Sequence, residues 1–337
     1  MISFSRIKSS IAPVLAAGLI SAFLISIGFN SASANPAIWK FEWPKTDFSK
    51  TSVNFDDIMS GGPPKDGIPS IDKPQFEKAG DVKGIAAKVP VISFSLNGDA
   101  RAYPLGILMN HEIVNDRVGG VPVIITYCPL CNSSIVFDAR LDGKILEFGV
   151  SGKLRNSDMV MYDRNTDSWW QQFLGEGIVG EMTGKQLKML PSRVESFERF
   201  VEKHPNGKVL KPVFASRGRA GMNPYAGYDS ARSPFLYRGK MPEGIAPMAR
   251  VIVVGKQAWS MALLRKEMKI EAGPLVLSWV EGQNSALDSR NIASGRDVGN
   301  VIVQRKTDKG LVDEVYDVTF AFVFNAFRPE GKLHKIN

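Results

Sequence analysis

Short apolar segments separated by turn residues dominate the chain from about residue 85 onward. Runs rich in β-branched and aromatic residues, bounded by Gly, Pro or Asn, predict strands. They lie at 89–96, 100–103, 121–127 and, as a hairpin turning at Asp142-Gly143, 135–150. Short helices are expected at 105–111 and 192–204. The close spacing of the strands predicts a β-rich α+β fold.

The first 34 residues have a different pattern. A basic start is followed by an uncharged apolar run from Ile11 to Phe29 and then by Ala32-Ser33-Ala34. These features are typical of a secretory signal peptide, so residues 1–34 are predicted to be removed after Ala34. An uncleaved membrane anchor is the alternative, because the run is nearly long enough to span a bilayer. Export predicts a periplasmic or secreted protein with no membrane span once the signal is removed.

An internal repeat is predicted from three matches in the same order. The segment 127–133 is similar to 279–285, and 102–105 is similar to 258–261. Downstream, Tyr162-Asp163 and Phe173 match Tyr316-Asp317 and Phe327. Two tandem related β-rich repeats joined by a partly helical connector are therefore expected. The predicted divisions are an extended N-terminal arm at 35–84, the first repeat at 85–180, the connector at 181–249 and the second repeat at 250–330.

Composition and charge narrow the class of protein. With 44% apolar and 23% charged residues the chain is globular. Its net charge of +8 is spread along the sequence rather than gathered in runs, which argues against a nucleic-acid partner. A partner protein or a small molecule in the periplasm is expected instead, and its identity is left open.

Candidate chemistry centres on the only two cysteines, Cys128 and Cys131, in Tyr-Cys-Pro-Leu-Cys. The second repeat has Val280 and Gln283 at the matching positions, so the fold does not depend on the pair. Three interpretations stay open. The first is a local disulfide, which would stabilise the fold only weakly because it closes a very small ring. The others are a thiol–disulfide exchange site and a soft-metal site for copper or zinc. A thioredoxin fold is not expected, because a β pattern resumes soon after Cys131.

Further ligands are expected from residues near the cysteines. His111 precedes the strand that carries Cys128, and Met161 offers a thioether suited to Cu(I). A second, weaker hypothesis places Trp169, Gln171 and Arg164 in the wall of a pocket for a small molecule or cofactor. Whether the chain is an enzyme is not decided by the sequence.

Several motifs in combination resemble one family. They are Ala102–Leu105, His111–Asp116, Thr126–Cys131, Phe148–Leu154 and Met161–Arg164. Together they are similar to the bacterial domain-of-unknown-function 3179 family, over roughly residues 85–330. The resemblance implies that His111 and the cysteine pair belong to the family's signature, and it implies no activity.

The leading hypothesis is an exported protein whose Cys-Pro-Leu-Cys site binds a soft metal of the copper type or exchanges disulfides. The rival is a non-catalytic periplasmic binding or scaffold module without a metal cofactor. In it the cysteines form a structural local disulfide, and the pocket near Trp169 and Gln171 holds a small molecule or partner.

Overall fold

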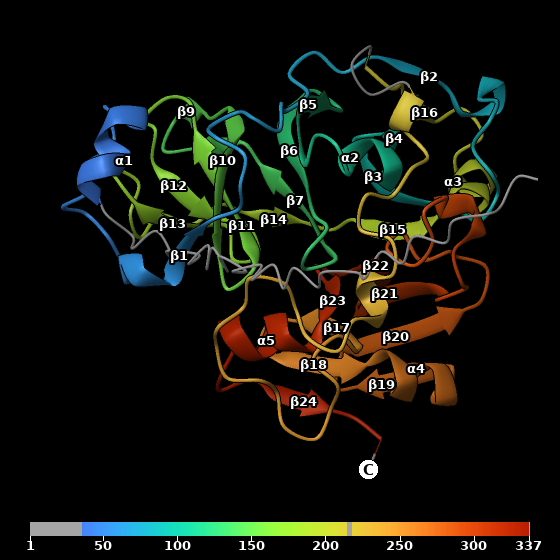
Figure 1. Ribbon diagram of the computed structural model, residues 1–337. Helices are drawn as coiled ribbons and strands as arrows, with labels where there is room; N and C mark the ends of the chain where they lie inside the picture. Colours follow the sequence, from blue (N-terminus) through green and yellow to red (C-terminus); the bar gives the residue numbers. More distant parts are fainter. Residues whose placement is uncertain (1–35, 214–217, 337) are drawn as a thin grey trace, which may run out of the picture. The chain divides into compact units, whose positions relative to one another are not determined.

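Hairpins of short strands make up most of the structure, as the short apolar segments of the sequence predict. The computed structural model describes residues 36–213 and 218–336. Within this part of the chain the strands form five small sheets in a five-bladed, propeller-like arrangement, together with one two-stranded ribbon (Figure 1). The β-rich prediction is confirmed. The predicted signal peptide, residues 1–34, lies outside the described residues.

Three sheets come mainly from the amino-terminal half. Sheet 1 has the order β15-β3-β4-β16-β2, with β2 (Phe76–Lys78), β3 (Pro90–Leu96), β4 (Asp99–Pro104), β15 (Arg193–Ser196) and β16 (Lys208–Leu210). Sheet 2 has the order β14-β7-β6-β5, with β5 (Ile113–Val118), β6 (Val121–Cys128), β7 (Ser133–Asp138) and β14 (Met189–Leu190). Sheet 3 follows the order β1 (Ile58–Ser60), β10 (Phe148–Arg155), β11 (Asp158–Asp163), β12 (Trp169–Gln171) and β13 (Glu176–Val179).

Two sheets come from the carboxyl-terminal half. Sheet 4 follows the order β23 (Asp317–Phe320), β17 (Arg250–Val254), β18 (Gln257–Ser260) and β24 (Lys332–His334). Sheet 5 follows the order β19 (Lys269–Ala272), β20 (Leu275–Val280), β21 (Asn300–Thr307) and β22 (Gly310–Asp313). The ribbon pairs β8 (Arg140–Leu141) with β9 (Lys144–Ile145) across the predicted Asp-Gly turn.

The helices are short and connect strands. They are α1 (Pro36–Glu42), α2 (Leu105–Leu108), α3 (Phe197–Lys203), α4 (Met261–Glu267) and α5 (Ala321–Phe327). The helix predicted at 192–204 is divided, because its first residues form β15, which pairs with β3. In the residues that the structure describes, no helix is both long and apolar enough to cross a bilayer.

Sheets 1 and 4 share one topology. In each, a helix links an outer antiparallel strand to a parallel strand on the far side of a hairpin: β15-α3-β16 around β3-β4, and β23-α5-β24 around β17-β18. Sheets 2 and 5 also share an order, in which all four strands are antiparallel. This similarity is what a duplication would produce, and the duplication itself stays a prediction.

The predicted boundaries of the repeats differ from the arrangement of the sheets. Residues 181–249, the predicted connector, contribute β14, β15 and β16 to sheets that also hold strands of the predicted first repeat. Tyr162-Asp163 ends β11 in sheet 3, whereas Asp317 begins β23 in sheet 4, so this third match joins strands with different surroundings. The predicted arm, 35–84, adds edge strands β1 and β2 to sheets 3 and 1.

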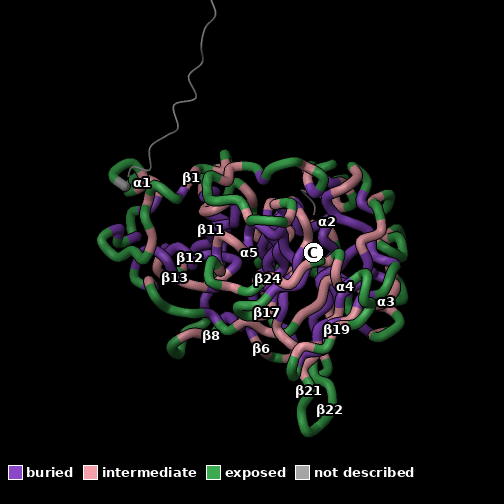
Figure 2. The backbone as a smooth tube through the Cα atoms, turned by 90° about the horizontal axis from the view of Figure 1, so that it is seen from below, coloured by how far each residue is buried: buried purple, intermediate pink, exposed green. Residues whose placement is uncertain are grey.

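Apolar side chains of four sheets meet in one large buried cluster, which includes both cysteines. Figure 2 shows the buried backbone in the interior of the molecule and the exposed β21–β22 hairpin projecting from it. A separate aromatic cluster forms where α1 and the segment after it pack on sheet 3, around Trp43 and Trp169. The cysteines are therefore part of the buried core.

Candidate metal centre

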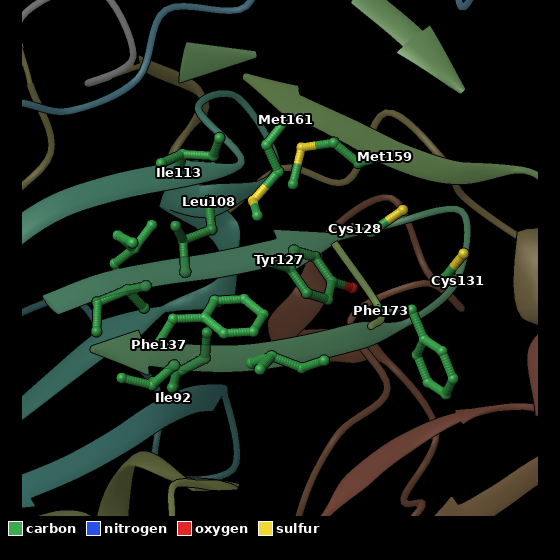
Figure 3. Close-up of a cluster of buried hydrophobic side chains, with 14 of the residues drawn as sticks. Ile92, Leu108, Ile113, Tyr127, Cys128, Cys131, Phe137, Met159, Met161 and Phe173 are labelled. Carbon is green, nitrogen blue, oxygen red and sulfur yellow. The ribbon is translucent and has the colours of Figure 1, made fainter. Parts of the chain in front are cut away.

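The two cysteines occupy the tight turn between β6 and β7. Cys128 is the last residue of β6 and faces Ser133, the first of β7. The Cys131 amide donates to the Cys128 carbonyl at 3.2 Å, and Asn132 closes the turn with a positive φ of 52°. Because the turn is this short, both sulfurs lie at the same end of the strands (Figure 3). A strand follows directly, so the expectation against a thioredoxin-type helix is confirmed.

The thiols are close together and buried. Their sulfur atoms are 3.7 Å apart with no disulfide between them, and the side chains are 2% and 0% exposed. Both thiols point at the Ser157 carbonyl, with sulfur–oxygen distances of 3.9 Å for Cys128 and 3.5 Å for Cys131. The pair is thus held by the β10–β11 turn as well as by its own.

Asp158 is the third member of this cluster. Its carboxylate and the two sulfurs offer ligand atoms that all lie within 4.8 Å of one another. Asn156 and Ser157 form the preceding turn with positive φ values of 52° and 65°, and Asp158 then begins β11. Asn and Ser tolerate this left-handed conformation better than bulky residues, and it brings the carboxylate to the cysteine turn.

Only one oxygen of the Asp158 carboxylate is satisfied. Oδ2 accepts hydrogen bonds from Gln171 Nε2 at 2.6 Å and from the Phe173 amide at 2.9 Å. Oδ1 is buried and has no hydrogen-bond partner among the described residues. A buried polar atom without a partner is costly, so its position beside two thiols calls for a chemical explanation.

Burial shifts the protonation of the whole cluster. It raises the pKa of the Cys128 thiol, raises that of Cys131 well above its usual value, and raises that of Asp158 to about 6. Burial also raises the pKa of Glu112 to about 8, with the Asp158 charge adding to the effect. Without a cation, the two thiols and Glu112 therefore favour their neutral, protonated forms near pH 7, whereas Asp158 is mostly ionised.

Two other parts of the chain cover the cysteine turn. From β23, the Thr319 hydroxyl and the Phe320 amide donate to the Cys131 carbonyl, at 2.7 and 3.3 Å. The segment 225–237, called the covering segment below, adds the Tyr228 hydroxyl, which donates to the Leu130 carbonyl at 3.1 Å.

The covering segment is also tied to the Asp158 turn. The Tyr228 hydroxyl accepts from the Phe235 amide at 3.2 Å, and the Ser157 hydroxyl donates to the Phe235 carbonyl at 2.6 Å. The Phe235 side chain itself is 57% exposed. The covering segment therefore separates the cluster from solvent with a thin, hydrogen-bonded layer.

The structure does not bring His111 and Met161 into the Cys128–Cys131–Asp158 group. His111 is buried and its Nδ1 donates to the Pro69 carbonyl at 2.7 Å, while Nε2 has no partner in the described part of the chain. Met161 belongs to the buried apolar cluster, with Met159 beside it (Figure 3). Sequence proximity alone suggested both as ligands, and neither is needed to describe the group.

The three residues predicted to line one pocket lie in different places. Trp169 packs on Trp39, Trp43 and Phe48 in the aromatic cluster. Arg164 forms surface ion pairs with Asp72 and Glu147. Gln171 is the exception, because it reaches the cluster by its hydrogen bond to Asp158.

The fold and site together define a class: a five-bladed, propeller-like β protein with a buried Cys-x-x-Cys pair and a carboxylate. The family model described as "Protein of unknown function (DUF3179)" matches residues 65–331, so the chain belongs to this family. No curated protein and no solved structure matches the chain. The resemblance inferred from the motifs is confirmed, and the family supplies no activity.

Proposed function

We propose that this chain is an exported metal-binding protein in which Cys128, Cys131 and Asp158 hold one thiophilic metal ion. The observation that carries the proposal is the unpartnered Asp158 oxygen buried against two thiols. A metal ion would satisfy that oxygen and replace the thiol protons. Metal ions bind thiolates and carboxylates in their deprotonated forms. The positive charge of the metal would therefore also offset the cost of burying these three groups as anions.

The spacing of the donors favours zinc. Two Zn–S bonds of about 2.3 Å at the tetrahedral angle separate the sulfurs by about 3.8 Å. The observed separation is 3.7 Å. A linear two-thiolate arrangement, at the same bond length, would separate them by about 4.6 Å. A carboxylate oxygen is also a harder donor than Cu(I) prefers, so copper is the second choice of metal.

Disulfide exchange with a protein partner is less well supported. The thiols are close enough to form an internal disulfide after a small movement, but they are buried and their pKa values are raised. Disulfide exchange needs a thiol that is both accessible and deprotonated, and burial opposes access as well as deprotonation here. In an oxidising compartment a bound metal would also keep such a pair reduced, which fits the predicted export.

The proposal is tested by metal analysis of the mature chain purified without oxygen and with reductant. We expect one zinc ion per chain, with copper in its place if Cu(I) is supplied in excess. Cys128→Ser and Asp158→Asn should each lose most of the bound zinc, whereas Met161→Leu should keep it. A wild-type chain without metal that oxidises readily to the internal disulfide would overturn the proposal and favour a structural clip.

A further inference from the structure

Gln171 determines which oxygen of Asp158 faces the thiols. Its Nε2 donates to Oδ2 at 2.6 Å, and the Phe173 amide donates to the same oxygen at 2.9 Å. With Oδ2 accepting two hydrogen bonds, Oδ1 is the oxygen left for a metal. The Gln171 side chain is fully buried, so water does not compete with it for Asp158.

The Gln171 amide is itself oriented. Its Oε1 accepts from Arg155 Nη1 at 3.3 Å, which leaves Nε2 to point at Asp158. Pairing of β12 with β11 places Gln171 opposite Val160, two residues along β11 from Asp158. Arg155, Gln171 and Asp158 therefore form a chain of polar contacts that ends at the free carboxylate oxygen.

We propose that Gln171 is a positioning residue that makes Asp158 a one-oxygen metal ligand and so sets the preference of the site for zinc over Cu(I). This inference rests on the proposed metal binding. Outer hydrogen bonds orient metal ligands and tune their donor strength. Cu(I) draws its affinity mainly from the two thiolates, so it depends less on how the carboxylate is held.

The chain offers a matched control in the neighbouring residue. Gln172 is equally buried, but its Nε2 donates to the Thr126 hydroxyl at 2.9 Å instead of to the carboxylate. Replacing either glutamine by methionine removes a buried amide while keeping the volume nearly constant. Any general loss of packing or stability should therefore be similar in the two variants.

The experiment measures Zn²⁺ and Cu(I) dissociation constants by competition with chelators, for wild type, Gln171→Met and Gln172→Met. Gln171→Met should weaken zinc binding by about 10- to 100-fold. It should leave Cu(I) binding within about threefold of wild type. Gln172→Met should change neither dissociation constant by more than about threefold. The ratio of zinc affinity to Cu(I) affinity should therefore change only in Gln171→Met.

The outcomes separate the two proposals. If wild type binds neither metal, the proposed function fails and this inference fails with it. If wild type binds zinc and the two glutamine variants behave alike, metal binding stands and the role of Gln171 is refuted. Should Gln171→Met fail to fold, NMR of the wild type decides: zinc should shift the Gln171 side-chain amide signals and not those of Gln172, and equal shifts overturn the inference.

Discussion

At the scale of single residues, Asp317 links the carboxyl-terminal half to the cysteine-bearing hairpin. Its Oδ1 accepts a hydrogen bond from the Ser134 amide at 2.9 Å, and its side chain is buried. Burial raises the pKa of this carboxyl to about 7, well above the value of an exposed aspartate. The folded chain therefore holds a proton at Asp317 under conditions in which the unfolded chain has released it.

This shift predicts a dependence of stability on pH. Between about pH 4 and pH 7 the folded state binds more protons than the unfolded state, so the free energy of unfolding falls as pH rises. Asparagine does not titrate, so Asp317→Asn should remove this loss. The change in the free energy of unfolding that the substitution causes should be more favourable near pH 8 than near pH 4, by up to about 4 kcal/mol.

Urea unfolding of the metal-free chain at the two pH values measures the difference. Asp138→Asn is the control, because hydrogen bonding to Arg140 lowers the pKa of Asp138 and the substitution should bring no gain at high pH. An Asp317→Asn variant that loses stability equally at both pH values would show that the carboxylate is charged in the folded state.

The residue scale also shows what spacing along the chain can predict. Cys128 and Cys131 were predicted to act together, because two intervening residues keep their sulfurs close in any tight turn. Asp158 was missed, because its approach depends on the conformation of the β10–β11 turn. The signal was the run Asn156-Ser157-Asp158, since Asn and Ser often occupy left-handed turn positions ahead of a strand. Gln171 was singled out as part of a pocket wall, whereas in the structure its amide donates to the buried Asp158 carboxylate.

At the scale of elements, the covering segment lies over the buried cluster, so a metal ion would have to pass it to reach the thiols. Two hydrogen bonds tie it to the Cys128–Cys131 turn and to Ser157, and a third, from the Phe235 amide to the Tyr228 hydroxyl, lies within the segment. Such thinly held segments open locally far more often than a sheet unfolds. Opening of residues 225–237 is therefore the expected route to the thiols.

Tyr228→Phe tests this route. The substitution removes one hydrogen bond to the turn and one within the segment, each worth about 1 kcal/mol, so the open state should become about 5- to 30-fold more populated. Labelling of the metal-free thiols by a small alkylating reagent should speed up by the same factor. Tyr237→Phe is the control, because the Tyr237 hydroxyl donates to the Lys240 carbonyl outside the turn. Equal labelling rates in wild type and Tyr228→Phe would contradict access by this route.

Element boundaries were predicted well where the local pattern was strong. The strand at 89–96 and the Asp142-Gly143 turn are seen close to their predicted positions. The segment 192–204 was predicted as one helix, but pairing with β3 draws Arg193–Ser196 into a strand. Tertiary pairing of this kind is not visible in local composition.

At the scale of the whole molecule, the propeller-like arrangement brings the site together. The cysteines come from sheet 2, Asp158 and Gln171 from sheet 3, and the hydrogen bonds that cover the turn from sheet 4. The sequence suggested related halves from similar segments. In the sequence, strands β10–β13 of sheet 3 come between β7 and β14, which both belong to sheet 2. The local pattern could not show this, because nothing in it distinguishes an inserted sheet.

X-ray absorption at the zinc edge of the anaerobically purified wild-type chain tests the central claim most directly. The account predicts two sulfur neighbours at about 2.3 Å and oxygen neighbours at about 2.0–2.2 Å. Asp158→Asn loses most of its zinc on purification, so it is reloaded with excess zinc; its oxygen shell should then change while both sulfurs stay. A zinc ion surrounded only by nitrogen and oxygen, or a chain that takes up no metal with its thiols reduced, would contradict it.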